Sequence, residues 1–491
     1  MIQIETLVAF FVYLVFLLAI GWFYYKRTVS IEGYILGGRG LGSWVTALSA
    51  QASDMSGWLL MGLPGAVYLG GLNEAWIAIG LFLGTVLNWI FVSARLRVYT
   101  KQTETLTLSS FFESRFHDPT GLLRIGSSII ILLFFTIYSS SGLVAAGKLF
   151  ESIFHINYDV AVISGAVVIV AYTFLGGFSA VCWTDFFQGA LMFFAIIVVP
   201  AMGVADNGGV SVIEATMHAK NIATGLFHTG TGELLSITAI ISTMAWGLGY
   251  FGQPHILTRF MGIRSVKELP KATIIAVVWV FISLSAAVVV GMVAIPMFDG
   301  LTGGDQEKVF IYMISKLFNP WVGGILLAAI LSAIMSTIDS QLLVSSSALT
   351  EDLYKKLFRR DASQKELVLV GRLCVLIISV IALYMALNPN NTILGLVAYA
   401  WGGFGAAFGP VVLFALFSKK TTWQSALAGM LVGTLVLIVW KQAGLGSMMY
   451  EIVPGFVANL VTILLVNLVV PQHNDEILRE FDRMKAGLNE D

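Results

Sequence analysis

The chain is divided into apolar stretches of about 20 residues, and this pattern decides its structural class. An α-helix rises ~1.5 Å per residue, so a stretch of this length crosses the ~30 Å hydrocarbon layer of a bilayer. Of the 491 residues, 57% are hydrophobic and 12% are charged, about half the ~25% charge of a soluble domain. The sequence therefore predicts an all-α integral membrane protein with many spans.

Thirteen transmembrane helices are predicted from these stretches. They cover 5–25, 43–70, 75–97, 125–149, 159–180, 186–205, 234–257, 273–298, 321–349, 367–387, 391–417, 422–441 and 451–470. The first is expected to be a retained helix, because a long apolar run from Leu7 to Tyr25 follows Glu5 rather than a basic cluster. Cys182 and Cys374 lie in or at apolar segments and indicate no disulfide framework.

Lysine and arginine gather on one side of the predicted spans. Thirteen spans place the two termini on opposite sides, and 23 of the 28 Lys and Arg residues then fall on one side. The other five are Lys148, Lys220, Lys308, Lys316 and Lys441. Because cytoplasmic loops carry the excess of positive charge, we predict that the N-terminus lies outside and the C-terminus in the cytoplasm.

Two predicted spans are interrupted in the same way. Span 43–70 contains "SDMSGWLLMGLPG" and span 234–257 contains "WGLGYFGQPH". A single glycine in a membrane helix is explained by close packing, but paired interruptions five spans apart are typical of inverted repeats with a binding site at the broken helices. We therefore divide the chain into 1–42, a first repeat 43–205, a loop 206–233, a second repeat 234–420, peripheral spans 421–470 and a tail 471–491.

The first interruption offers both signs of charge in the middle of the membrane. A helix that ends near Ala52 to Met55 presents free carbonyls with partial negative charge, which attract a cation. A helix that begins near Ser56, Gly57 and Trp58 presents free amides, which attract an anion such as a carboxylate. The break is therefore predicted to be a working element of the protein.

The ninth span supplies further oxygens for a cation. Ala333, Ser336 and Thr337 are spaced i, i+3 and i+4 and share one helix face. With the carbonyls of Ala52 and Met55 they form a set of neutral oxygen ligands, which suits sodium better than a divalent ion. In the alternative interpretation, the two hydroxyls bond back to carbonyls of their own helix.

The polar strings in these spans resemble motifs of the sodium–solute symporter family from about residue 5 to 470. The strings are "YILGGRGLG", "ALSAQASDMSGWLLMGLPGAVYLGG", "AWGLGYFGQPHILTRFM", "ILSAIMSTIDSQLLVSSSALTEDLYKK" and "AYAWGGFGAAFGPVVLFALF". The resemblance implies a LeuT-like fold of thirteen helices with spans 2–11 as two inverted repeats. It also implies sodium-driven uptake of L-proline by alternating access, without an organic cofactor, a nucleic acid or an obligatory protein partner.

The resemblance also assigns residues. The family's sodium site falls on Ala52, Met55, Ala333, Ser336 and Thr337. Together with the helix start at the break, its substrate side falls on Ser56, Gly57, Trp58, Tyr138, Trp246, Tyr250 and Pro254. Coupling or gating roles are predicted for Arg39, Asp54, Asp185 and Asp339.

Several of these residues have structural explanations as well. Trp246 and Tyr250 are i, i+4 and could be ordinary aromatic packing, and Arg39 could be an anchor on the positive side. Asp185 could be the N-cap of the sixth predicted span or could act on the ion exit path. Asp339 could support a second cation together with Asp185, bind a proton, or be a solvated residue of the cytoplasmic vestibule. We expect the last, with one sodium carried per proline.

Asp54 is functional by default, because an ionisable group inside a span is costly. We expect it to attract sodium and to hold the broken helix.

Other classes of function fit less well. The sequence contains no HExxH, GxSxG or nucleotide-binding loop, which argues against an enzyme. A membrane sensor needs a long cytoplasmic extension, and a channel needs a filter-like carbonyl motif. The remaining alternatives are another small solute of the same family, such as pantothenate or a sugar, and proton coupling through Asp54 or Asp339.

Overall fold

The computed structural model describes residues 4–25, 30–173, 177–388 and 391–488. Within these ranges the chain is helical, and extended backbone pairs only as isolated bridges. Lys26 and Arg27 of the charge count and residues 174–176 of the predicted span 159–180 lie outside the described residues.

The helices follow one another with short connections. In chain order they are α1 (Ile4–Tyr25), α2 (Ile31–Leu36), α3 (Ser43–Asp54), α4 (Leu63–Gly70), α5 (Ala75–Leu87), α6 (Ser93–Gln102), α7 (Leu108–Arg115), α8 (Leu122–Phe154), α9 (Tyr158–Thr173), α10 (Phe178–Asp206), α11 (Val210–Ala219), α12 (Ile237–Met244), α13 (Pro254–Gly262), α14 (Leu269–Met297), α15 (Val309–Leu317), α16 (Pro320–Ser347), α17 (Gln364–Ala386), α18 (Ile393–Phe417), α19 (Trp423–Gln442), α20 (Ile452–Val469) and α21 (Asp475–Gly487).

Ten helices among the described residues are long and apolar enough to cross a membrane. Three shorter apolar helices, Trp58–Gly70, Tyr158–Ala171 and Ile237–Gly252, lie in the predicted spans 43–70, 159–180 and 234–257. The all-helical membrane class is therefore confirmed, whereas the count of thirteen spans stays a prediction.

Both predicted interruptions are present. Helix α3 ends at Asp54, Met55 and Ser56 leave the helical path, and the chain resumes at Trp58 with a π-helical turn that leads into α4. The second interruption consists of a 3₁₀ segment, Ala245–Gly252, followed by the extended residue Gln253 before α13 begins.

Gly57 has helical backbone angles at the first break, so its left-handed freedom is not what the site requires. A Cβ atom at this position would lie 2.9 Å from the Cβ atom of Ala145 in α8, which explains the glycine by close packing.

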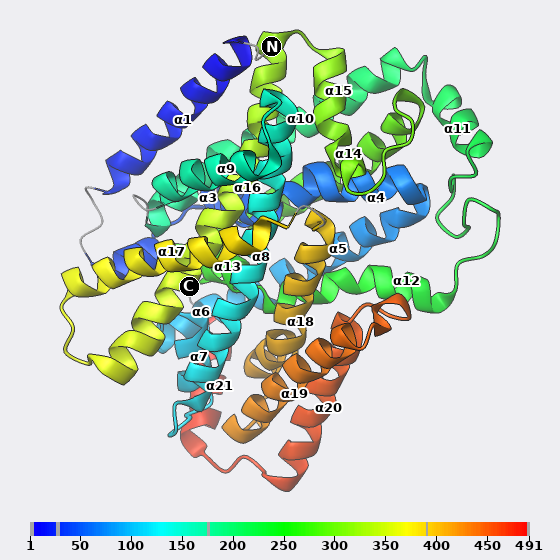
Figure 1. Cartoon of the computed structure of the whole chain (residues 1–491). Helices are drawn as coiled ribbons and strands as arrows, with labels where there is room; N and C mark the ends of the chain where they lie inside the picture. The colour runs from blue at the N-terminus through cyan, green and yellow to red at the C-terminus, as the bar shows by residue number, and fades with distance from the viewer. Residues whose placement is uncertain (1–3, 26–29, 174–176, 389–390, 489–491) are drawn as a thin grey trace.

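The broken helices lie at the centre of the molecule. Helix α3 packs against α10, α14 and α16, while α8 and the 3₁₀ segment before α13 both pack against α18. The pair α19 and α20, drawn in orange and red in Figure 1, lies beside α18 at one side of the bundle. Helix α1 contacts α16 and α10 and exposes much of its apolar surface, as expected of a peripheral membrane helix.

Several helices of the structure differ from the predicted boundaries, and two of these differences concern the site. Helix α10 begins at Phe178 rather than near residue 186, and the second broken span continues to Gly262 rather than ending near 257. In both cases a polar residue, Asp185 or Arg259, made the sequence look like the end of a membrane segment. The structure buries both residues between helices. The two differences change the interpretation of Asp185 and Arg259.

The polar tail after α20 forms a further helix. Helix α21 packs against α6, with Ile477, Phe481 and Met484 buried. The Arg115 guanidinium lies 5.4 Å from the centre of the Phe481 ring and donates to the carbonyls of Ala415 and Ser418 at the end of α18. The tail is thus docked on the side of the molecule where α18 ends.

Candidate functional site

The carbonyl of Ala52 is released from its own helix by the break. In a continuous helix it would accept the N–H group of Ser56, but that N–H donates to the carbonyl of Asp54 at 3.0 Å. The Ala52 carbonyl instead accepts the Ser336 hydroxyl at 2.7 Å and the Thr337 hydroxyl at 3.4 Å. The break in α3 therefore faces α16 directly.

Four of the five predicted sodium ligands meet in one buried place, namely Ala52, Ala333, Ser336 and Thr337. The hydroxyls of Ser336 and Thr337 also lie 3.3 Å and 3.1 Å from the carbonyl of Ala333, so they bond to their own helix and to α3 at once. The side chains of the five predicted residues are at most 1% exposed, and Met55 caps the end of α3. Their neutral oxygens fit a hard monovalent cation.

Asp54 lies at the end of α3, beside this group. Its side chain is 0% exposed, its Oδ2 atom accepts the Tyr250 hydroxyl at 2.6 Å, and its Oδ1 atom is buried without a hydrogen-bond partner among the described residues. Its backbone carbonyl accepts the indole N–H of Trp58 at 3.0 Å and lies 3.5 Å from the Tyr138 hydroxyl. Asp54 thus connects the break to the second broken helix.

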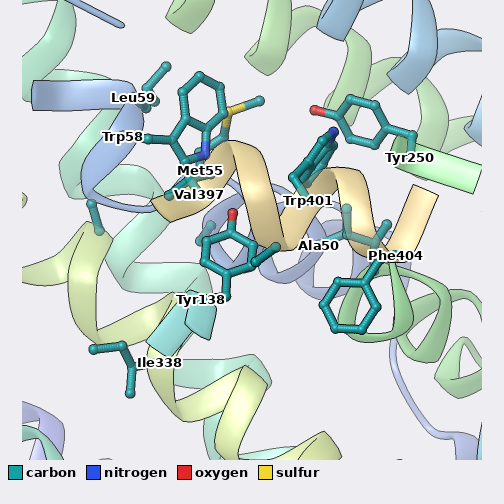
Figure 2. Close-up of a cluster of buried hydrophobic side chains, with 14 of the residues drawn as sticks. Ala50, Met55, Trp58, Leu59, Tyr138, Tyr250, Ile338, Val397, Trp401 and Phe404 are labelled. Atoms are coloured by element: carbon teal, nitrogen blue, oxygen red, sulfur yellow. The ribbon is translucent and has the colours of Figure 1, made fainter. Parts of the chain in front are cut away.

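Aromatic side chains surround the start of the second half-helix. The ring of Trp58 lies 6.5 Å from that of Trp246, measured between centroids. Figure 2 shows Trp58 and Tyr138 near Met55, with the rings of Tyr250 and Trp401 side by side. The structure therefore gathers the predicted aromatic residues around the break.

The three other predicted substrate residues lie on the two breaks. The Ser56 hydroxyl accepts the N–H group of Trp58 at 3.4 Å, and Gly57 packs against α8. Pro254 begins α13 and is buried. Ser56 and Gly57 belong to the first break, and Pro254 belongs to the second. All three are close in sequence to residues of the aromatic group.

A group of charged side chains lies beside α3, where sequence reasoning expected a loop. Arg259 donates through Nη2 to the Asp185 carboxylate at 3.1 Å and to the Ser340 hydroxyl at 2.5 Å, and through Nε to the Ser49 hydroxyl at 3.1 Å. Ser49 in turn donates to Asp185 at 2.7 Å. All four side chains are buried, so this cluster joins α3, α10, α13 and α16 away from water.

The structure corrects three predictions about charged residues. Asp185 lies well inside α10 and is not the N-cap of that helix, whose N-cap residue is Gly177. Asp339 was expected to be solvated, yet its side chain is 0% exposed. The charge of Arg259 was counted with the cytoplasmic loops, and it is instead buried in α13.

Arg39 holds several segments together at one end of the bundle. Its guanidinium donates to the carbonyls of Met261 at 2.9 Å, Thr100 at 3.0 Å and Thr105 at 2.7 Å. Burial and the neighbouring Arg97 lower the pKa of Arg39 to about 10, so the group stays charged at neutral pH. These bonds exceed what a surface anchor needs and are consistent with a closure of this end.

Hollows of similar size lie at the two ends. One of about 370 Å³ is lined by Trp246, Glu307 and Ala398, among others, and one of about 320 Å³ at the Arg39 end is lined by Thr103, Glu104 and Thr105, among others. Glu307 pairs with the buried Lys148 at 2.5 Å and accepts the N–H groups of Ile393 and Leu394 at the start of α18. A cavity of about 20 Å³ lies near Ile35 at the Arg39 end, which has room for about one water molecule. Trp246 therefore borders the space on the Glu307 side.

Comparison with known proteins assigns this architecture to a family. Residues 34–433 match the model of the sodium:solute symporter family. The chain belongs to this family. Its transporters are not enzymes, in agreement with the sequence prediction.

Relatives of this symporter family cover nearly the whole chain. The high-affinity proline transporter PutP of Bacillus subtilis is 50% identical over 469 residues, which is 95% of this chain and 98% of the relative. The sodium/proline symporter of Escherichia coli is 50% identical over 476 residues, covering 95% and 94% of the two chains. The osmoregulated proline transporter OpuE of Bacillus subtilis is 45% identical over 491 residues, covering 99% of each.

Solved structures support the symporter fold. A sodium-coupled sialic acid symporter in a substrate-bound outward-open state matches with a TM-score of 0.77 at 19% identity, over 95% of this chain and 98% of the other. The nucleobase-cation symporter Mhp1 in a closed conformation matches with a TM-score of 0.54 at 15% identity, over 91% and 98%. At these identities the likeness shows the fold and nothing about the substrate.

Sequence reasoning missed two buried residues of this symporter. Trp401 of α18 donates its indole N–H to the carbonyl of Trp246 at 2.7 Å, and its ring packs edge-on against Tyr250 at 5.0 Å. A Cβ atom at Gly249 would lie 1.9 Å from the Trp401 nitrogen, so only glycine allows this approach. The second missed residue is Arg259. A tryptophan in a glycine-rich string and an arginine inside a broken span were the signals available in the sequence.

The buried ion pair of the symporter gives a prediction for stability. We expect Asp185→Asn to lower the free energy of unfolding by about 3–5 kcal/mol, because it leaves the charge of Arg259 buried without its counter-charge. The midpoint of thermal unfolding of the detergent-purified protein checks this prediction. It is followed with a fluorescent dye that does not react with thiols. Asp482→Asn is a matched control, since Asp482 is solvent-exposed and lies 3.7 Å from Lys419. Equal midpoints for the two variants would contradict the prediction.

Proposed function

We propose that this chain is a secondary active transporter that imports L-proline together with sodium by alternating access. The observation that carries this proposal is the break in α3, whose free Ala52 carbonyl faces two hydroxyls of α16. Relatives at about half identity over nearly the full chain are named as proline transporters or sodium/proline symporters. Family, fold and local geometry therefore agree on an ion-coupled carrier.

The sodium ion is proposed to bind between α3 and α16. Its ligands are the carbonyls of Ala52, Met55 and Ala333 and the hydroxyls of Ser336 and Thr337. A hydroxyl has lone pairs in addition to its proton, so each can turn an oxygen towards the ion while its hydrogen stays on a carbonyl. Because these ligands carry no net charge, a monovalent ion suits the site better than a divalent one.

Proline is proposed to bind beside the ion. Its carboxylate would face the amides at Ser56, Gly57 and Trp58, where the second half-helix begins. The amides of Ser56 and Trp58 would then exchange their bonds to the Asp54 carbonyl and the Ser56 hydroxyl for bonds to the carboxylate. Its pyrrolidine ring would lie against the aromatic faces of Trp246 and Tyr250, and its ammonium group would lie near a ring face or a carbonyl. Tyr138 and Pro254 border the same region of the two breaks.

Sodium and proline are proposed to be coupled because the break in α3 borders both of their sites. An ion held by both α3 and α16 favours the arrangement in which these helices are together, and a ligand shifts an equilibrium only through such a difference in affinity. That arrangement also fixes the start of the second half-helix, where the proline carboxylate would bind. Sodium binding would thus prepare the substrate site. The charged residues proposed for coupling or gating are Asp54, Arg39, Asp185 and Asp339.

One sodium per proline supplies enough driving force. Proline is zwitterionic at neutral pH, so one net charge moves inward, which contributes ~2.3 kcal/mol at ~100 mV. A tenfold sodium gradient adds ~1.4 kcal/mol. The sum of ~3.7 kcal/mol supports roughly 500-fold accumulation of proline. We propose this one-to-one ratio for the transporter.

The orientation and the repeats belong to the same proposal. The excess of Lys and Arg on one side supports an extracellular N-terminus and a cytoplasmic C-terminus in a bacterial inner membrane. The hollow that reaches Trp246 would then open to the outside, and Arg39 would close the cytoplasmic end. Segments 43–205 and 234–420 would form the two inverted repeats, each beginning with a broken helix.

Uptake of labelled L-proline into proteoliposomes tests the proposal. We expect accumulation with an inward sodium gradient and none with an inward proton gradient at equal membrane voltage. Proton-driven uptake without sodium would contradict sodium coupling and shift the ion role to Asp54 or Asp339. No proline uptake with either ion would contradict the substrate, and competition with pantothenate and with sugars would then identify another solute of the family.

A further inference from the structure

We propose that Tyr450 is a positioning residue of the substrate site, because it holds the ring of Trp246 at the wall of the hollow. Tyr450 belongs to the connection between α19 and α20, outside both proposed repeats. No sequence motif singled it out. The inference rests on the proposed role of Trp246 as a substrate contact.

Tyr450 is fixed by three contacts from different elements. Its ring lies 5.4 Å from the Trp246 ring between centroids, at an interplanar angle of 35°. Its hydroxyl donates to the carbonyl of Ala398 in α18 at 2.6 Å, and its backbone N–H donates to the hydroxyl of Ser242 in α12 at 2.7 Å. With 8% of its surface exposed, it belongs to the interior although it lies in a loop.

The local sequence places the ring at this spot. The chain leaves α19 through Gly444, which has a left-handed backbone (φ 70°), and makes a short 3₁₀ turn before Tyr450. Glu451 then forms an ion pair with Lys441 at 3.0 Å, which helps to close the connection. The ring of Tyr450 is thereby directed towards the space between α12 and α18.

The Trp246 ring is consequently held from two directions. Trp58, at the start of the second half-helix, lies 6.5 Å from it, and Tyr450 lies 5.4 Å from it. The Trp246 carbonyl is fixed separately by Trp401. Without the Tyr450 ring, the indole would lose one of its two aromatic neighbours and could turn into the hollow.

The hydroxyl of Tyr450 ties this position to the wall of the hollow. Ala398, which accepts that hydroxyl, lines the same 370 Å³ hollow as Trp246. The Tyr450 ring therefore keeps Trp246 and the wall formed by α18 at a fixed separation. A change in the ring should alter how tightly the substrate binds, and it should leave the later steps of transport largely unchanged.

The test compares variants of the full-length transporter in proteoliposomes under a sodium gradient. We expect Tyr450→Ala to raise the KM for L-proline about tenfold, as expected for loss of an aromatic neighbour. The maximal rate per inserted transporter should stay within about twofold of wild type. Tyr450→Phe keeps the ring against Trp246 and loses only the bond to Ala398, so its KM should stay well below that of the Ala variant, within about threefold of wild type. Tyr384→Ala, at a position 80% exposed on α17, is the matched control and should change neither constant.

A mutant cycle with Trp246→Ala separates positioning from a general structural effect. In the Trp246→Ala background, Tyr450→Ala should raise the KM by less than about twofold, since its partner is already gone. A wild-type KM for Tyr450→Ala, or equal KM values for the Phe and Ala variants, would overturn the inference. So would full additivity in the cycle. If Trp246→Ala alone leaves the KM unchanged, the proposed substrate site itself fails, which is a distinct result.

If Tyr450→Ala is not inserted into the membrane, Tyr450→Leu takes its place. Leucine fills some of the volume without an aromatic face, and the same rise in KM with an unchanged maximal rate is expected. A wild-type KM for that variant would overturn the inference as well.

Discussion

Ser336→Ala and Thr337→Ala are each expected to raise the sodium concentration for half-maximal proline uptake by about 10- to 100-fold. Each variant removes one of the two hydroxyls that meet the Ala52 carbonyl across the break. A polar contact to a charged group contributes about 1.5–3 kcal/mol, which corresponds to that range. The double variant should show no sodium-dependent uptake at ordinary sodium concentrations.

The measurement is the initial rate of labelled proline uptake against external sodium at constant voltage. Ser332→Ala is the control, because Ser332 lies one turn earlier on α16 and donates to the carbonyl of Ala328 rather than to α3. Its sodium dependence should equal that of the wild type. An unchanged sodium dependence in Thr337→Ala and Ser336→Ala would mean that the ion binds elsewhere.

Asp54→Asn is expected to lower proline uptake by about 100-fold at a fixed sodium concentration. The substitution keeps the shape of the side chain and removes its negative charge next to the proposed ion site. Asp54 is 0% exposed, so water does not screen the loss. An effect of about 3 kcal/mol, the upper range for a charge-assisted contact, corresponds to this factor.

Tyr250→Phe distinguishes the effect of the Asp54 charge from the effect of the hydrogen bond that Asp54 accepts. This variant removes the hydroxyl that donates to Oδ2 at 2.6 Å and leaves the carboxylate in place. We expect a rise of about tenfold in the KM for proline, with a sodium dependence close to wild type. If Asp54→Asn transports proline with normal sodium dependence and is inserted in normal amount, the charge has no role in coupling.

The break and the shared helix face of Ser336 and Thr337 were within reach of the sequence because their signals are local. Glycines and a proline inside an apolar run predict a broken helix, and the structure places the end of the first half at Asp54, as predicted. The spacing of Ser336 and Thr337 fixes a common helix face, whatever the surroundings are. Only the distance to α3 had to come from the structure.

The charged cluster and the aromatic support were out of reach because they depend on packing between distant segments. Arg259 looks like a loop residue in the sequence, and only the meeting of four helices shows that its charge is paired with Asp185. Asp339 was placed in water for the same reason. Tyr450 lies roughly 200 residues from Trp246 in the chain, and no periodic pattern links the two.

The Arg259 cluster has a consequence for the speed of the transport cycle. One guanidinium binds Ser49, Asp185 and Ser340 and also the carbonyl of His255 in its own helix. Moving α3, α10 or α16 away from α13 therefore breaks a hydrogen bond to the same buried charge. If this end opens during transport, we expect the loss of these bonds to give the step a large activation enthalpy. The turnover of the carrier should accordingly slow steeply in the cold.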